Sequence, residues 1–137
     1  MTNEKQKITQ SLFDPKIRSQ YEFYVSVVVI REIERAPIQK QKELKEQIMD
    51  VPVLELTKGA DLLAEAYIRS KVLPASSLED AQHVAIATTH NLDAVVSWNY
   101  KDLVNLRRVK LLNLVNEEMG YKHIEIVSPR EVIGYEL

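Results

Sequence analysis

Residues 73–103 read LPASSLEDAQHVAIATTHNLDAVVSWNYKDL, and this stretch decides the expected fold. The alanine-rich run from Leu78 to about His90 predicts a helix with one face small enough to lie close to a sheet. The apolar, β-branched run Asp93–Ser97 predicts a buried strand directly after that helix. A helix that leads into a buried strand and then a polar turn is typical of parallel α/β proteins.

The same alternation extends outward from this stretch in both directions. Strands that are separated by helices predict parallel βαβ units, and we therefore expect a single α/β domain over residues 1–137. In chain order, the further expected elements are a helix within 4–13, a strand at 21–25, helices from Ser26 to Arg35 and from Gln39 to Ile48, a strand at 53–56, a helix capped by Thr57, a loop and cap at Pro74 and Ser76-Ser77, a helix from Leu106 to Met119 ended by Gly120, a strand at 124–127 and a helical turn begun by Pro129.

Composition narrows the class of protein. Apolar residues make up 45% of the 137 residues and charged residues 28%, which indicates a globular chain. The absence of cysteine excludes disulfides and thiolate metal sites, so a bound metal would need oxygen or imidazole ligands. The net charge of −2 argues against a protein that coats nucleic acid with a basic surface. Apolar runs far shorter than the roughly 20 residues of a membrane span, and a polar N-terminus, predict a cytoplasmic protein without membrane contact.

The predicted carboxyl ends of strands, where α/β sheets bind ligands, carry Ser26 and the turn Ser97-Trp98-Asn99. Glu32 lies near the second turn of the helix that follows Ser26, and Asp80 lies in the first turn of the alanine-rich helix. Asn99 and Asp102 follow the strand at 93–97. Carboxylate oxygens are the ligands that Mg²⁺ and Mn²⁺ prefer, and such ions activate water in phosphodiester cleavage.

Each of these residues also has an ordinary structural explanation. Glu32 fits a solvated helix charge, and Asp80 would stabilise a helix N-terminus without any metal. His83 fits a packing or hydrogen-bonding role, and Asn99 and Asp102 are common turn residues. Spacing alone therefore leaves both explanations open.

Three segments, in order and at matching intervals, resemble the pattern of PIN domains of the kind found in VapC-type toxins. These are a strand, Ser26 and a helix with Glu32-Ile33; then Asp-Ala-x-His-x-Ala-x-Ala from Asp80; then hydrophobic-Ser-Trp-Asn-x-Lys ending at Lys101. The resemblance runs from about Ile8 to the end of the chain. Its remaining parts are Leu103–Arg108, Gly120-Tyr121 and Ser128–Ile133.

The resemblance implies a PIN-like three-layer sandwich around a short parallel sheet, and cleavage of RNA with Mg²⁺ or Mn²⁺. Glu32 and Asp80 match the second and third acidic positions of the family, which hold the metal. Asn99 matches the fourth catalytic position, beside the hydroxyl position held by Ser97. Ser26 matches the small residue before the Glu32 helix, and His83 and Asp102 take supporting roles.

The sequence departs from the family at its start. The family's first acidic residue lies in an N-terminal strand, whereas residues 1–10 are polar and favour a helix. We expect an N-terminally truncated domain without the usual first strand, and impaired metal binding. Burial of a central strand is worth several kcal/mol at ~25 cal/mol per Å², against a margin of roughly 5–15 kcal/mol for a domain. A closed gap, a partner's strand or a homodimer would compensate.

Two functions from different classes follow. The first is a metal-dependent endoribonuclease, the toxin of a type II toxin–antitoxin pair, with an antitoxin protein as partner. The second is a catalytically inactive PIN-like domain that acts in binding or oligomerisation. A nucleotide-binding domain is disfavoured because three glycines cannot supply a glycine-rich loop. The candidate RNA contacts, which would otherwise form a solvated helix face, are Lys101, Arg107, Arg108 and Lys110.

Overall fold

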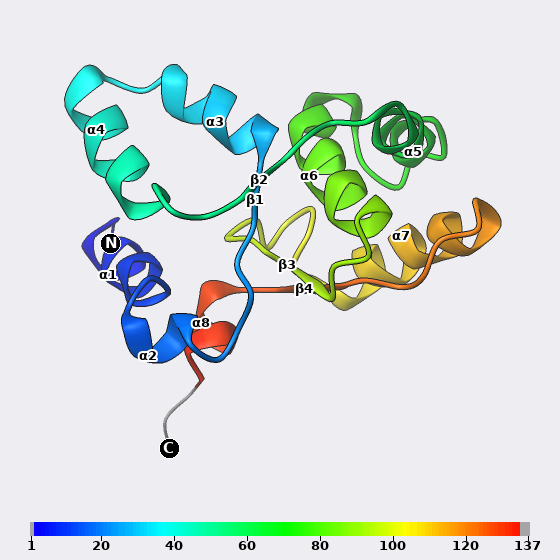
Figure 1. Ribbon diagram of the computed structural model, residues 1–137. Helices are drawn as coiled ribbons and strands as arrows, with labels where there is room; N and C mark the ends of the chain where they lie inside the picture. Colours follow the sequence, from blue (N-terminus) through cyan, green and yellow to red (C-terminus); the bar gives the residue numbers. More distant parts are fainter. Residues whose placement is uncertain (1, 135–137) are drawn as a thin grey trace. The chain divides into compact units, whose positions relative to one another are not determined.

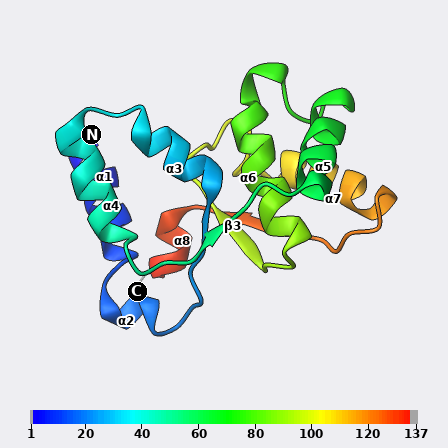
Figure 2. The same ribbon diagram turned by 45° about the horizontal axis from the view of Figure 1, so that its top comes forward.

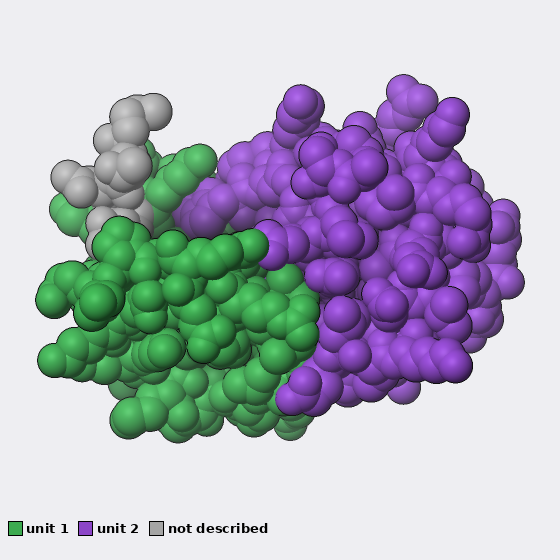
Figure 3. Space-filling model, turned by 90° about the horizontal axis from the view of Figure 1, so that it is seen from above, with its two compact units in different colours: residues 1–54, 129–137 green, residues 55–128 purple. Residues whose placement is uncertain are grey.

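The computed structural model describes residues 2–134 and contains helices together with short parallel strands (Figure 1). The chain forms two compact units, which are coloured separately in Figure 3. Unit 1 contains the residues up to Leu54 and those from Pro129 onward, and unit 2 is Glu55–Ser128. A single domain over the whole chain stays a prediction.

Unit 2 is built on helices α5 and α6, which lie side by side in both ribbon views (Figures 1 and 2). Alanine-rich faces on both helices allow this close packing, around the fully buried Leu63 and Val84. The two strands pair in parallel, with Val95 opposite Ile126. The elements of unit 2 are α5 (Lys58–Arg69), the 3-10 helix η1 (Ala75–Ser77), α6 (Leu78–Thr89), β3 (Ala94–Val96), α7 (Leu106–Glu118) and β4 (Glu125–Val127).

All three long helices of unit 2 end in the same way, in a Schellman motif. At the end of α5, the N–H of Val72 donates to the carbonyl of Tyr67 at 3.1 Å, and equivalent bonds of 3.0 and 2.8 Å close α6 and α7. The residue inside each turn has positive φ: 60° at Lys71, 59° at Asn91 and 84° at Gly120. The predicted helix stop at Gly120 is confirmed.

A buried hydrogen-bond network joins α5, α7 and the start of β4. The Tyr67 hydroxyl donates to Asn116 Oδ1 at 2.5 Å, and Asn116 Nδ2 donates to Asn113 Oδ1 at 3.0 Å. Asn113 then bonds both backbone groups of Ile124, at 2.9 and 2.8 Å. Burial raises the pKa of Tyr67 well above its ordinary value, so this hydroxyl stays a donor.

Unit 1 combines helices with one short parallel strand pair, in which Val25 lies opposite Val53. Ser26 caps the helix that follows it, accepting a hydrogen bond from the N–H of Val29 at 3.4 Å, as predicted. Arg130 bonds Glu4 at 2.9 Å and joins the last helix to the first. The elements of unit 1 are α1 (Thr2–Ser11), α2 (Pro15–Arg18), β1 (Val25–Ser26), α3 (Val27–Glu34), α4 (Ile38–Gln47), β2 (Val53–Leu54) and α8 (Pro129–Ile133).

The mixed α/β class and the parallel pairing are confirmed, whereas the expected strands are too long. Residues 21–24 and 55–56 lie outside the ladder, because β1 and β2 pair over two residues each. The expected strand at 93–97 is present as β3 but is not buried, since Ala94 and Val95 are half-buried and Val96 is 44% exposed. None of the helices in the described part of the chain is long and apolar enough to span a membrane.

Candidate functional site

Unit 2 brings two of the predicted site residues into direct contact. Asp80 lies in the first turn of α6, and Asn99 lies in the turn that follows β3. Asn99 Nδ2 donates a hydrogen bond to Asp80 Oδ2 at 2.9 Å, and both side chains are half-buried. The contact forms where a parallel strand ends, which is where ligands bind in α/β sheets.

A hydrogen bond within the turn after β3 determines which way the Asn99 side chain points. The N–H of Asp102 donates to Asn99 Oδ1 at 3.0 Å, while the backbone N–H of Asn99 donates to Ser97 Oγ at 3.0 Å. A reversed amide would place its oxygen against the Asp80 carboxylate and its NH₂ group against the N–H of Asp102. Both contacts would be repulsive, and the turn therefore selects one orientation.

The Asp102 carboxylate has partners on both oxygens. Ser77 Oγ donates to Oδ2 at 3.3 Å, and Arg108 Nη2 lies 3.8 Å from Oδ1, at ion-pair distance. Arg108 Nη1 also donates to the backbone carbonyl of Val72, at the end of α5. The side chain of Asp102 is 14% exposed and that of Arg108 is 30% exposed, so solvent screens this pair less than a surface pair.

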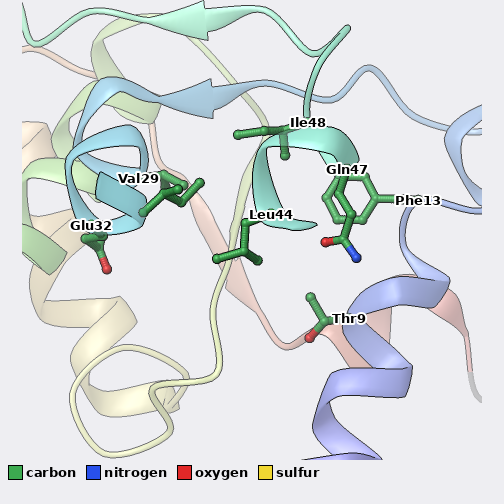
Figure 4. Close-up of a pocket in the computed structure, with 8 residues that line it drawn as sticks. Thr9, Phe13, Val29, Glu32, Leu44, Gln47 and Ile48 are labelled. Carbon is green, nitrogen blue, oxygen red and sulfur yellow. The ribbon is translucent and has the colours of Figure 1, made fainter. Parts of the chain in front are cut away.

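Glu32 and Ser26, the other predicted site residues, belong to unit 1. Glu32 lies on α3, is exposed, and borders an apolar hollow of about 300 Å³ (Figure 4). The joining of Glu32 with Asp80 in one metal site stays a prediction. The other residues that line the hollow are Thr9, Phe13, Val29, Ile33, Leu44, Gln47 and Ile48.

The predicted RNA contacts divide into two kinds. Lys101, Arg107 and Lys110 are exposed, as phosphate-binding side chains must be. Arg108 is half-buried and engaged with Asp102 and Val72. His83, for which a supporting role was predicted, is half-buried in the second turn of α6.

The donor chemistry of this site suits a hard cation, but unit 2 alone supplies few ligands. The carboxylate of Asp80 is an oxygen ligand of the kind that Mg²⁺ and Mn²⁺ prefer. The amide oxygen of Asn99 already accepts from Asp102, whose own carboxylate faces Arg108. Within residues 2–134, no group of three His, Cys, Asp or Glu side chains is placed to hold an ion.

The sequence did not predict the roles of Ser77 and Asn105 in the site. Ser77 lies at the N-cap position of α6, as predicted, but its hydroxyl bonds Asp102 instead of capping the helix. Asn105 caps α7 by accepting from the N–H of Arg108 at 2.9 Å, and its Nδ2 donates to the carbonyl of Lys101 at 2.7 Å. An Asn directly before a predicted helix is a known capping signal that would have identified Asn105.

Comparisons with protein-family models, with curated proteins and with solved structures return no match.

Proposed function

We propose that this chain is a PIN-type, divalent-metal-dependent endoribonuclease with a PIN-like sandwich fold, acting in the cytoplasm as the toxin of a type II toxin–antitoxin pair. The contact between Asp80 and Asn99, beside Ser97, is the observation that carries the proposal. These residues come from two separate motifs of the PIN pattern, and the turn after β3 assembles them at one place. RNA, an antitoxin protein and a second copy of the chain are the proposed partners.

The chemistry divides between the ion and the side chains. A bound Mg²⁺ or Mn²⁺ supplies an activated water and neutralises charge on the phosphate. Asp80 is the proposed ligand in unit 2, and Glu32 the proposed ligand from unit 1. Asn99 orients the Asp80 carboxylate, while Lys101, Arg107 and Lys110 hold the RNA backbone through its phosphates.

An RNA cleavage assay with the purified chain and Mn²⁺ tests the proposal. Asp80→Asn and Glu32→Gln change the charge with little change of shape, and each should lower the cleavage rate by more than about 100-fold. That expectation follows because residues that merely orient a metal ligand already cost 10–100-fold. Glu79→Gln and Glu34→Gln remove a carboxylate from the same two helices and serve as matched controls. Equal cleavage by all four variants would refute the proposed site.

A second candidate is a PIN-like domain that has lost catalysis and serves in binding or oligomerisation. The observation in its favour is that protein groups already compensate Asp80 and Asp102, through Asn99 and Arg108. Titration with Mn²⁺ separates the two candidates. Saturable binding that Asp80→Asn abolishes supports the nuclease, whereas no binding together with a stable dimer in sedimentation supports the inactive domain.

A further inference from the structure

Arg108 differs from the other basic residues near the proposed site in what its guanidinium contacts. It bonds the carbonyl of Val72 through Nη1 and faces Asp102 through Nη2. Arg107, its neighbour on α7, is exposed. Arg108 therefore joins three segments of unit 2: the end of α5, the turn after β3, and α7.

A continuous chain of contacts leads from Arg108 to Asp80. Arg108 holds the Asp102 carboxylate, the N–H of Asp102 donates to Asn99 Oδ1, and Asn99 Nδ2 donates to Asp80 Oδ2. Because the carboxylate and the N–H belong to the same residue, a displaced Asp102 would take its N–H away from Asn99. We infer that Arg108 is a positioning residue that sets the orientation of the Asn99 amide on Asp80, and not an RNA contact.

The chemistry of arginine explains why this position needs a guanidinium. Its planar fork reaches two acceptors in different directions at once, whereas a lysine ammonium is a single point charge on a flexible stem. Val72 O accepts a hydrogen bond from Nη1, and Asp102 Oδ1 lies at ion-pair distance from Nη2. Without the guanidinium, a carboxylate that is 14% exposed would lose its counter-charge and turn toward water.

The side-chain amide of Asn99 gives a direct test that needs neither metal nor RNA. Its two Nδ2 protons give a pair of NMR signals, identified by their loss in Asn99→Ser. In Arg108→Gln the chemical shifts of this pair should change, and the exchange of its protons with deuterium should accelerate by about fivefold. That factor corresponds to the net free energy of one hydrogen bond. Arg107→Gln, the matched control, should leave both properties unchanged. Unaltered Asn99 signals in folded Arg108→Gln would overturn the inference.

Cleavage kinetics give a second test, which rests on the proposed function. Arg108→Gln should lower kcat by roughly tenfold, below the 100-fold that a misplacement of 1 Å can cost, with RNA affinity unchanged. Arg107→Gln, in contrast, should weaken RNA affinity. Weakened RNA affinity in Arg108→Gln, with kcat retained, would make Arg108 an RNA contact and overturn the inference.

Failure of the proposed function, or of Arg108→Gln to fold, can be told apart from failure of the inference. If the parent chain cleaves no RNA, the proposed function fails, while the Asn99 signals still decide the role of Arg108. If Arg108→Gln does not fold, Asp102→Asn replaces it, since that variant keeps the backbone N–H but removes the charge that Arg108 holds. Asp102→Asn should then shift the Asn99 signals in the same way, and unshifted signals would count against the inference.

Discussion

Replacing Asn113 by alanine should destabilise unit 2 more than any change to an exposed position of the same helix. Asn113 is 8% exposed, and its side chain takes part in three hydrogen bonds, two with the backbone of Ile124 and one with Asn116. Asn113→Ala leaves three buried polar groups without these partners, each worth about 1–3 kcal/mol. The higher helix propensity of alanine returns about 0.5 kcal/mol. We expect a net loss of about 2.5–8.5 kcal/mol, a large part of the roughly 5–15 kcal/mol that holds a domain folded.

Urea denaturation followed by circular dichroism measures this loss, with the free energy of unfolding taken by linear extrapolation. Leu114→Ala is the matched control, since Leu114 is the next residue of α7 and is 54% exposed. Its free energy of unfolding should change by less than about 0.5 kcal/mol. A loss below about 1 kcal/mol in Asn113→Ala would show that water satisfies the three groups, and the reasoning about the buried network would be wrong.

Three further predictions concern single side chains of unit 2. Burial raises the pKa of Tyr67 above its ordinary value of 10.0. The stability that Tyr67 contributes is therefore complete below about pH 10 and is lost as the pH rises. The reason is that the unfolded chain then releases a proton from this hydroxyl that the folded chain retains. The urea midpoint should therefore fall less between about pH 9 and pH 11 in Tyr67→Phe than in the parent chain, and an equal fall would contradict the assignment. Lys71→Gly should stabilise the chain by up to about 1 kcal/mol and Asn91→Gly by less, because asparagine tolerates positive φ better than lysine. A lower thermal midpoint in Lys71→Gly would show that the backbone at Lys71 is not strained. Thr57 accepts from the N–H of Ala60 at 3.1 Å, so Thr57→Ala should lose about 1 kcal/mol in thermal unfolding whereas Thr57→Ser should keep most of it.

Helix boundaries were predictable wherever one residue type carries the signal. Ser26 and Thr57 cap helices, Gly120 lies in the turn that ends α7, and Pro129 begins α8, all as expected. Lys71 has the same left-handed backbone conformation after α5 that Gly120 has after α7, yet lysine, unlike glycine, does not indicate the end of a helix. At that position the packing of the helix end, and not local preference, determines the backbone. Strand lengths were overestimated for a related reason, because alternation along one segment does not say how many partner residues exist.

The candidate site was predictable to the extent that it depends on topology. Parallel strands end at one edge of a sheet, and this rule anticipated that Asn99 would lie near the start of the Asp80 helix. The role of Arg108 was not predictable, because charge alone does not distinguish a guanidinium that binds phosphate from one that holds Asp102. The difference lies in burial and in the carbonyl of Val72, which is distant in the sequence.

The hydrogen bond between Asn99 and Asp80 also has a consequence for equilibria. A carboxylate can ligate a cation while it accepts a hydrogen bond, so the bond from Asn99 would hold Asp80 in one orientation for a cation to meet. The apparent affinity of Asp80 for a cation would be its intrinsic affinity multiplied by the fraction of molecules in which the amide holds the carboxylate in this way. Residues that steady the amide without touching the cation, those of the turn after β3 among them, would therefore adjust how tightly it binds.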